Sequence, residues 1–555
     1  MNWCVFFMFD CEQFWGYFIL HRNYFVKSIK SLYCKMKNER PNVLLIMSDQ
    51  HHAGIMGCVG DRKAYTPNLD DLARNGVIFT NAYCSFPLCG PSRMSFMTCR
   101  HPHEISIWDN ESQLSSDIPT FAHSFLAAGY DTVLSGRMHF VGADQRHGFA
   151  ERIIGDCPES VYLAVGWKLK KVLGNLIDTP GMSLAGIIKS GPGKTGYHAY
   201  DEKVTDVTVR WLKERGKAKN DRPFLLVVGY AAPHCPFVAP EKDFEFYREK
   251  FLYHDLSQIK GDMHPMNAKK RKQFGLDPPP PLDAQWRVKV AYYGLCTFLD
   301  RQIGYILDAL KTSGFAKNTI VIYCSDHGES LGEHGLWWKS TFYDGSCKVP
   351  LIVSWQDRIK KGMICNENVS LMDVGTTIIA FAGINPLPGA SGRSFRPLLE
   401  GRKGKWTNIV FAEYAERGSK VVCRMVRKDT WKYNYYHGMQ PELSNLQDDR
   451  EEMINLAGRS AYRKIEEELK LLALKNWDPD YISKYMERRN KELGLIAHWI
   501  KTTTPPEPVP PWFSSAPQNY VDDTITPDRY ILINRNRKLK AVSYTHLTLP
   551  TIYSV

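Results

Sequence analysis

The sequence lacks several features that would narrow its class. Its fourteen cysteines include no Cys-x-x-Cys pair and no regular spacing, which argues against a disulfide framework and favours a reducing compartment. No internal repeat and no convincing membrane span is present. The net charge of +12 comes from Lys and Arg spread along 555 residues rather than from a basic stripe. We therefore expect no nucleic-acid and no membrane partner, and we interpret the basic run at residues 269–272 as a solvated loop. A cytoplasmic location is expected because the sequence shows no convincing signal peptide.

Both ends of the chain lack the patterning of a folded domain. Residues 1–35 are rich in aromatic side chains, but Asp10 and Glu12 interrupt them, and neither a basic start nor a small-residue cleavage site marks a signal peptide. Globular patterning begins just after Met36. We expect a native start there and a leader over residues 1–35 that is non-native or disordered.

Buried strands alternate with helices over most of the remaining chain. Four short apolar runs, at residues 42–47, 131–135, 223–230 and 318–324, are typical of buried strands. Helices are predicted between them, one of which has Thr66 as N-cap, Pro67 at its first position and Gly76 as its stop. This alternation predicts an α/β fold in which helices cover both faces of a mostly parallel central sheet.

The pattern also predicts the domain organisation. Insertions at about residues 155–197 and 251–286 have the length of lids and binding loops. After about residue 400 the pattern changes to a small antiparallel sheet followed by a helix. We expect a main domain over residues 36–400, an α+β subdomain over 401–503 and an extended tail over 504–555, whose last dozen residues look foreign.

Polar side chains gather where the four predicted strands end. The seven residues concerned are Asp49, Gln50, Arg137, His139, His234, Asp326 and His327. In an open α/β sheet the carboxyl ends of the strands form the ligand crevice, so these side chains should meet at one rim. The carboxylates of Asp49 and Asp326, the Gln50 amide and His327 suit calcium, magnesium or manganese. The sequence therefore predicts a divalent-cation site.

One cysteine stands in an unusual context. Cys89 begins the stretch "CGPSRMSFMTCR", in which Pro-Ser-Arg precedes a helix-like run. The motif resembles the signature of type I, formylglycine-dependent sulfatases of the alkaline-phosphatase-like superfamily, Cys-x-Pro-Ser-Arg followed by Leu-Thr-Gly-Arg. "PNVLLIMSDQ", "GYDTVLSGRMH", "PHCPF" and "SDHGE…K" resemble the same family in the same order, over about residues 42–448. Within the family, the stretches "SDIPTFAHSFLAAGYDTVLSGRMHFVGADQRHGF" and "GEHGLWWK" resemble choline-sulfatases and arylsulfatases. The Asp-Gln pair and Cys-Gly-Pro also resemble phosphonate monoester hydrolases of the same superfamily.

The resemblance implies a chemical role for this cysteine. In the family this cysteine is oxidised after translation to formylglycine by a modifying enzyme, and the Pro and Arg belong to the signal that this enzyme reads. The hydrated aldehyde carries two hydroxyls on one carbon, of which one attacks sulfur and the other then collapses to the aldehyde and expels sulfate. The helix expected to begin near Pro91 would direct its N-terminal N–H groups at the anion.

The resemblance also implies roles for other residues. Cys89 would be the nucleophile precursor and a metal ligand, and Arg93 would orient the diol. His234 and Lys339 would bind sulfate, and either could protonate the leaving alcohol. His139 would hydrogen-bond the formylglycine.

Three further points concern the metal-bound base and two departures from the family pattern. Asp326 could activate the formylglycine while bound to the metal. Arg137 stands where the family mostly has Lys, which keeps the charge but not the compact ammonium. Cys99 stands where the family has Gly, at the end of the predicted helix.

These observations predict an enzyme that cleaves a small organic sulfate monoester, choline sulfate or an aryl sulfate, with Ca²⁺ as the first candidate cation and Mn²⁺ or Mg²⁺ as the others. Four side chains are candidate contacts for the quaternary ammonium of choline: Trp108, Asp109, Trp337 and Trp338. Two alternatives stay open: a phosphonate or phosphate ester hydrolase on the same scaffold, and a non-catalytic binder of sulfated ligands in which Cys89 is never modified. The expected partners are the sulfate ester and the modifying enzyme, and a homo-oligomer stays open.

Overall fold

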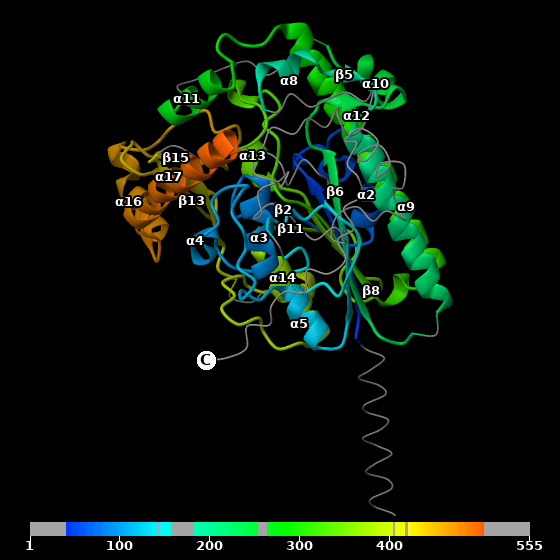
Figure 1. Ribbon diagram of the computed structural model, residues 1–555. Helices are drawn as coiled ribbons and strands as arrows, with labels where there is room; N and C mark the ends of the chain where they lie inside the picture. Colours follow the sequence, from blue (N-terminus) through cyan, green and yellow to red (C-terminus); the bar gives the residue numbers. More distant parts are fainter. Residues whose placement is uncertain are drawn as a thin grey trace, which may run out of the picture.

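A mostly parallel sheet forms the centre of the structure, and helices cover both of its faces (Figure 1). The structure, a computed structural model, describes residues 40–503 except 143, 157–181, 219, 253–262, 403–405 and 417–419. Within these residues the sheet has nine strands in the order β11-β2-β10-β8-β1-β6-β3-β4, and β9 pairs with β2. The strands are β1 (Asn42–Asp49), β2 (Val77–Tyr83), β3 (Asp131–Gly136), β4 (Glu151–Ile154), β6 (Phe224–Pro233), β8 (Thr319–Ser325), β9 (Lys348–Val349), β10 (Leu351–Ser354) and β11 (Met363–Ser370).

The four predicted strands are confirmed and lie next to one another. β1 pairs in parallel with β8 and with β6, and β6 pairs in parallel with β3. Every residue of β1 is buried, and its side chains alternate between the two faces: Leu44 and Ile46 join one apolar cluster, and Val43, Leu45 and Met47 join another. The uninterrupted apolar run in the sequence follows from this burial on both faces.

Helices from distant parts of the chain form the two outer layers. α2, α9 and α12 contribute to the cluster around Leu44, whereas α3, α5 and α14 contribute to the cluster around Leu45 (Figure 1). The α/β class is therefore confirmed, with β9 and β10 as antiparallel members of the sheet. The helices of this part are α2 (Pro67–Arg74), α3 (Cys89–Thr98), α4 (Pro102–Ile105), α5 (Phe121–Ala127), α8 (Leu184–Ile188), α9 (Gly196–Lys217), α10 (Glu241–Arg248), α11 (Pro265–Gln273), α12 (Leu282–Thr312), α13 (Asp344–Cys347), α14 (Met372–Ala382) and α15 (Arg396–Leu399).

Helix ends follow the predicted signals closely. α2 begins at Pro67 with Thr66 at the N-cap position and ends two residues before Gly76. α3 begins at Cys89, two residues earlier than predicted. Its C-cap is Cys99, which adopts the left-handed conformation (φ +55°) that glycine favours. A Cβ added at Gly375 of α14 would lie 2.3 Å from the Cys99 Sγ, so the thiol occupies the space that this glycine leaves.

A second, antiparallel sheet follows the main one. Its order is β12-β13-β14-β15, and α16 packs against β13 and β14. This confirms the predicted sheet and helix, whereas the exact domain boundaries stay a prediction. The leader over residues 1–35 and the tail over 504–555 lie outside the described residues. The elements are β12 (Ile409–Ala415), β13 (Val422–Lys428), β14 (Trp431–Tyr436), β15 (Glu442–Asn445), α16 (Arg463–Leu474) and α17 (Pro479–Thr503).

The second predicted insertion needs a correction. The segment interpreted as a loop contains α11, and α12 already begins at Leu282. The basic run at residues 269–272 lies on α11 rather than in a solvated loop, and the Lys270 side chain is buried. Lys270 packs here because its Nζ lies 3.8 Å from the centroid of the Tyr414 ring, on β12 of the second sheet.

Short elements connect the main ones. β5 (Gly191–Pro192) and β7 (Val238–Ala239) form a short parallel pair. Single turns of 3-10 helix lie at Gly57–Val59, Ala316–Asn318, Glu333–Gly335 and Ser460–Tyr462. None of the described helices combines the length and apolar character needed to cross a membrane.

Candidate active site

The predicted rim residues come together at the ends of the central parallel strands. Asp49 is the last residue of β1, and Asp326 directly follows β8, whose Ser325 pairs with Ser48. Arg137 directly follows β3. The end of β3 approaches β6 so closely that a Cβ at Gly229 would lie 1.8 Å from the carbonyl oxygen of Arg137. Glycine at position 229 therefore lets Arg137 reach the rim.

Cys89 lies in the middle of these side chains, at the first position of α3. Its thiol is buried, with Sγ 3.1 Å from the Nε2 of His327, 3.1 Å from the Nζ of Lys339 and 3.5 Å from an Asp49 carboxylate oxygen. The side-chain oxygen of Asn110 accepts a hydrogen bond from the Gly90 N–H at 2.8 Å. Because Cys89 is the first residue of α3, the positive end of the helix dipole lies at the thiol.

Four side chains form a candidate metal centre. One ligand atom from each of Asp49, Cys89, Asp326 and His327 lies within 4.8 Å of the others, and all four residues are buried. The Nδ1 of His327 lies 2.9 Å from the Gly328 carbonyl oxygen. An Nδ1–H donating to that oxygen leaves the Nε2 lone pair free as a ligand. Carboxylates with an imidazole nitrogen fit a divalent cation.

Two buried arginines surround the carboxylates. Arg93 donates from Nε to Asp326 at 2.8 Å and from Nη2 to Asp49 at 3.1 Å, and Arg137 donates from Nε to Asp49 at 2.7 Å. Burial raises the pKa of Asp49, but the charges of Arg137 and Arg93 outweigh it and hold that pKa well below its ordinary value. The Nη1 of Arg137 is buried and meets no acceptor among the described residues. The site therefore keeps a charged donor unused by the protein.

The other three predicted residues differ in protonation. Burial and the charge of Arg137 lower the pKa of His139 to about 3, and its Nε2 lies 3.2 Å from the Asn110 carbonyl oxygen. Burial and Lys339 likewise lower the pKa of His234. Burial also lowers the pKa of Lys339, but the opposing effects of Cys89 and Asp49 are larger together, so the net shift is upward. Lys339 is therefore protonated near neutral pH while both histidines are neutral.

Sequence reasoning missed two residues that touch this site. Asn110 contacts Gly90 through its side chain and His139 through its backbone, but nothing in the sequence distinguishes it from its neighbours. Glu329 lies within the "SDHGE" motif and receives a hydrogen bond from the Gln50 side chain. An acidic residue three positions after Asp326 was the signal in the sequence that could have identified Glu329 as a site residue.

The four candidate choline contacts lie in packed surroundings. Trp108 is 1% exposed, and its ring centroid lies 4.9 Å from that of Tyr485 on α17. Trp337 and Trp338 are buried in the apolar cluster beneath α12. Asp109 caps a turn, because its carboxylate accepts hydrogen bonds from its near neighbours in the chain. Substrate contact by these residues stays a prediction.

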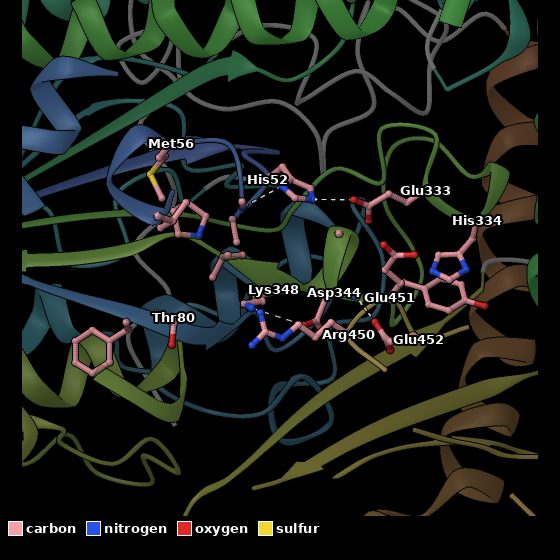
Figure 2. A pocket seen from close by; sticks show the side chains of 18 of the residues that line it. His52, Met56, Thr80, Glu333, His334, Asp344, Lys348, Arg450, Glu451 and Glu452 are labelled. Carbon is pink, nitrogen blue, oxygen red and sulfur yellow. Dashed lines mark hydrogen bonds and ion pairs between the residues drawn. The ribbon is translucent and has the colours of Figure 1, made fainter. Parts of the chain in front are cut away.

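A separate groove of about 770 Å³ lies beside the strand ends (Figure 2). His52 and Glu333 line it and point toward each other, with their nearest N and O atoms 3.4 Å apart. Asp344 and Lys348 also line it, between Thr80 and Glu452 in this view, and form an ion pair of 3.8 Å. The described residues that line this groove include no member of the candidate metal centre.

Comparison with known proteins decides the family. A family model described as sulfatase matches residues 41–384. The chain belongs to the sulfatase family. A second model, described as N-sulphoglucosamine sulphohydrolase, C-terminal, matches residues 332–476. The resemblance inferred from the motifs is confirmed, and this sulfatase is a sulfuric ester hydrolase.

Individual relatives support the same assignment. A choline-sulfatase from Rhizobium meliloti is 33% identical over 76% of this chain and 83% of its own length. An arylsulfatase from Clostridium perfringens is 28% identical over 79% of this chain and 94% of its own length. The phosphonate monoester hydrolase of Agrobacterium radiobacter superposes with a TM-score of 0.67 at 23% identity, covering 79% of this chain and 96% of that one. This last likeness concerns the fold alone.

Proposed function

We propose that this sulfatase hydrolyses a small organic sulfate monoester, with choline sulfate and aryl sulfates as the named candidates, and that Cys89 is the precursor of its formylglycine nucleophile. One observation carries the proposal: the Cys89 thiol lies within 3.5 Å of the Lys339 amine, the His327 imidazole and the Asp49 carboxylate. A nucleophile in this position would meet a protonated amine and the candidate metal ligands at once. The relatives named choline-sulfatase and arylsulfatase support the substrate class.

The candidate metal centre fits a divalent cation. Asp49, Gln50, Asp326 and His327 would hold it together with an oxygen of the converted Cys89, and Ca²⁺ is the first candidate because most of these ligands are hard oxygens. When bound, such a cation polarises the oxygens of the sulfate ester. The protein's own task is to keep the Asp49 carboxylate ionised, which Arg137 and Arg93 do by lowering its pKa.

The remaining side chains can bind and protonate the substrate. Arg137 offers its unused Nη1 donor to the sulfate, and the N-terminal end of α3 adds a favourable dipole. Lys339 is protonated whereas His234 is neutral, which favours Lys339 as the proton donor to the leaving alcohol and His234 as a hydrogen-bond partner. His139 stays neutral beside Asn110 and is suited to hydrogen-bond the hydroxyls at position 89.

The test combines mass analysis with a substrate panel. The peptide that contains Cys89 should show the thiol converted to an aldehyde when the protein is made with a formylglycine-generating enzyme. Cys89→Ala should abolish turnover while the unfolding free energy changes little, and Cys89→Ser should fail as well unless the host converts serine. Near-normal turnover in Cys89→Ala would end the proposal.

The substrate panel separates the alternatives. Specificity constants should be measured for choline sulfate, a neutral aryl sulfate and a phosphonate monoester on fully converted enzyme. We expect the sulfate esters to be preferred, because the relatives that match over most of the chain are named for them. A clear preference for the phosphonate ester would replace the proposed substrate class, and an unmodified Cys89 with no turnover would favour a binding protein.

A further inference from the structure

Lys339 lies between two residues whose backbone conformations an L-amino acid does not favour. Trp338 before it and Ser340 after it both have positive φ, of +65° and +76°. Hydrogen bonds hold the peptide groups on both sides. Ser330 donates its N–H to the Trp338 carbonyl at 2.7 Å, and Ser340 donates its N–H to the Pro87 carbonyl at 3.1 Å. A loop with such geometry depends on the contacts that fix it.

One buried carboxylate supplies a further contact to this loop. Glu329 has no exposed surface, and its Oε1 accepts the Trp338 N–H at 2.6 Å and the Leu331 N–H at 2.8 Å. Its other oxygen, Oε2, accepts a hydrogen bond from the side-chain amide of Gln50 at 2.5 Å. Glu329 therefore connects the loop that carries Lys339 to the residue that follows Asp49.

The contact with Gln50 fixes which way its amide points. An amide can turn over and exchange its oxygen for its NH₂ group with little change in shape. A carboxylate only accepts hydrogen bonds, so Glu329 selects the orientation in which the Gln50 NH₂ faces it. The Gln50 oxygen then faces Lys339, whose Nζ donates to it at 2.9 Å. Only that oxygen, and not the NH₂ group, can serve as a metal ligand.

We infer that Glu329 is a positioning residue of this sulfatase, which orients the Gln50 oxygen toward the metal centre and anchors the backbone that presents Lys339. The inference rests on the proposed function for the metal centre and for Lys339, and adds the residue that aligns the two. The hydrogen bonds of Glu329 go to Gln50, Leu331 and Trp338, so it acts on the Cys89 thiol and on Lys339 only through these residues.

The chain offers a matched control for burial. Asp373, at the start of α14, is also a buried carboxylate, and it accepts the N–H groups of Ser370 and Arg393 at 2.9 and 2.6 Å. Like Glu329, Asp373 accepts hydrogen bonds from two backbone N–H groups, but no hydrogen bond from a side-chain amide is found for it among the described residues. Asp373→Asn therefore measures what the loss of a buried charge alone does to the protein.

The experiment titrates Ca²⁺ into metal-stripped protein by calorimetry. In Glu329→Gln an NH₂ group would face the Gln50 NH₂, so Gln50 should turn over, and the Ca²⁺ dissociation constant should rise about 10- to 100-fold, as for other partners of metal ligands. The double variant Glu329→Gln/Gln50→Glu exchanges the two groups and should recover most of that loss. Asp373→Asn should bind Ca²⁺ like the wild type. Unchanged affinity in Glu329→Gln, or no recovery in the double variant, would overturn the orienting role.

A second measurement reads the loop without any metal. Amide hydrogen exchange at Trp338 in metal-free protein should be faster in Glu329→Ala than in wild type, and unchanged in Asp373→Asn. Equal exchange in wild type and Glu329→Ala would overturn the anchoring role. These outcomes differ from failure of the proposed function, in which wild-type protein itself would bind no divalent cation and lose no turnover on chelation. Denaturant unfolding of each variant shows whether it is folded. If Glu329→Gln is unfolded, the double variant is compared with the wild type, and weak Ca²⁺ binding by the folded double variant would overturn the orienting role.

Discussion

Two buried clusters of charged residues differ in how their charges are paired. Where the second sheet meets the first, Lys432 of β14 donates to Asp344 at 2.9 Å and contacts a Glu452 oxygen at 2.8 Å. At the strand rim, by contrast, Lys339 faces a thiol and an amide, and Arg137 keeps a buried N–H without an acceptor among the described residues.

The difference distinguishes a charge cluster that stabilises the fold from one that can bind ligands. In the cluster around Lys432 the opposite charges neutralise one another, so nothing further is needed to satisfy them. At the rim the carboxylates of Asp49 and Asp326 converge on one point while cations surround them, an arrangement that is completed by an added cation and an added anion. Incomplete pairing therefore marks the functional cluster better than burial does.

The largest effect should follow from Asp49→Asn at the rim. An amide keeps the size of the side chain but removes the charge that a divalent cation needs, so the rate should fall by at least about 100-fold. Activity and Ca²⁺ binding after chelation and stepwise readdition measure both losses. Survival of full activity under complete chelation would break the comparison, since the rim would then need no added cation.

A large effect on stability, without one on chemistry, should follow from Lys432→Met. Removing Lys432 takes the cation at 2.8 Å from Glu452 and the one at 2.9 Å from Asp344, which keeps only the longer pairs with Lys348 and Arg427 among the described residues. We expect the unfolding free energy to fall by about 3 kcal/mol, the lower end of the range for a broken buried ion pair. Denaturant unfolding measures this, with Lys428→Met as control. Lys428 pairs with Glu468 at the surface, and its loss should change stability by less than about 1 kcal/mol. If the two variants lose equal stability, the cluster around Lys432 does not stabilise the fold more than a surface ion pair does.

The sequence predicted those features that short segments determine. Apolar runs such as residues 42–47 predicted strands buried on both faces, and the ends of parallel strands brought Asp49, Asp326 and His234 to one rim. Features that depend on distant segments were missed. Trp108 is covered by Tyr485 of α17, and no local pattern near residue 108 predicts that contact.

Lys270 shows the same limit most clearly. Its run of four basic residues is typical of an exposed loop, but the partners that bury it, Ser340 and Tyr414, come from segments about 70 and 144 residues further along the chain. Composition within a short window cannot reveal such partners. Lys270 is also a buried cation that belongs to neither cluster. The carboxylate of Glu416 pairs with the neighbouring Lys269 at 3.0 Å, and among the described residues no carboxylate forms an ion pair with Lys270.

The smallest effect tests what a buried cation without a carboxylate partner does to stability. Burial lowers the pKa of Lys270 to about 8, against the opposing effects of Cys423 and Glu416, whereas an unfolded lysine titrates near pH 10.4. Between these values the unfolded chain binds more protons at this group, so its contribution makes stability rise with pH. From pH 8.5 to 9.5 the unfolding free energy of the wild type should gain about 1 kcal/mol relative to Lys270→Met. Lys272→Met, an exposed neighbour on α11, should follow the wild type. Parallel pH profiles for wild type and Lys270→Met would show that Lys270 is charged in the fold without penalty, and that an unpaired buried cation needs no functional explanation.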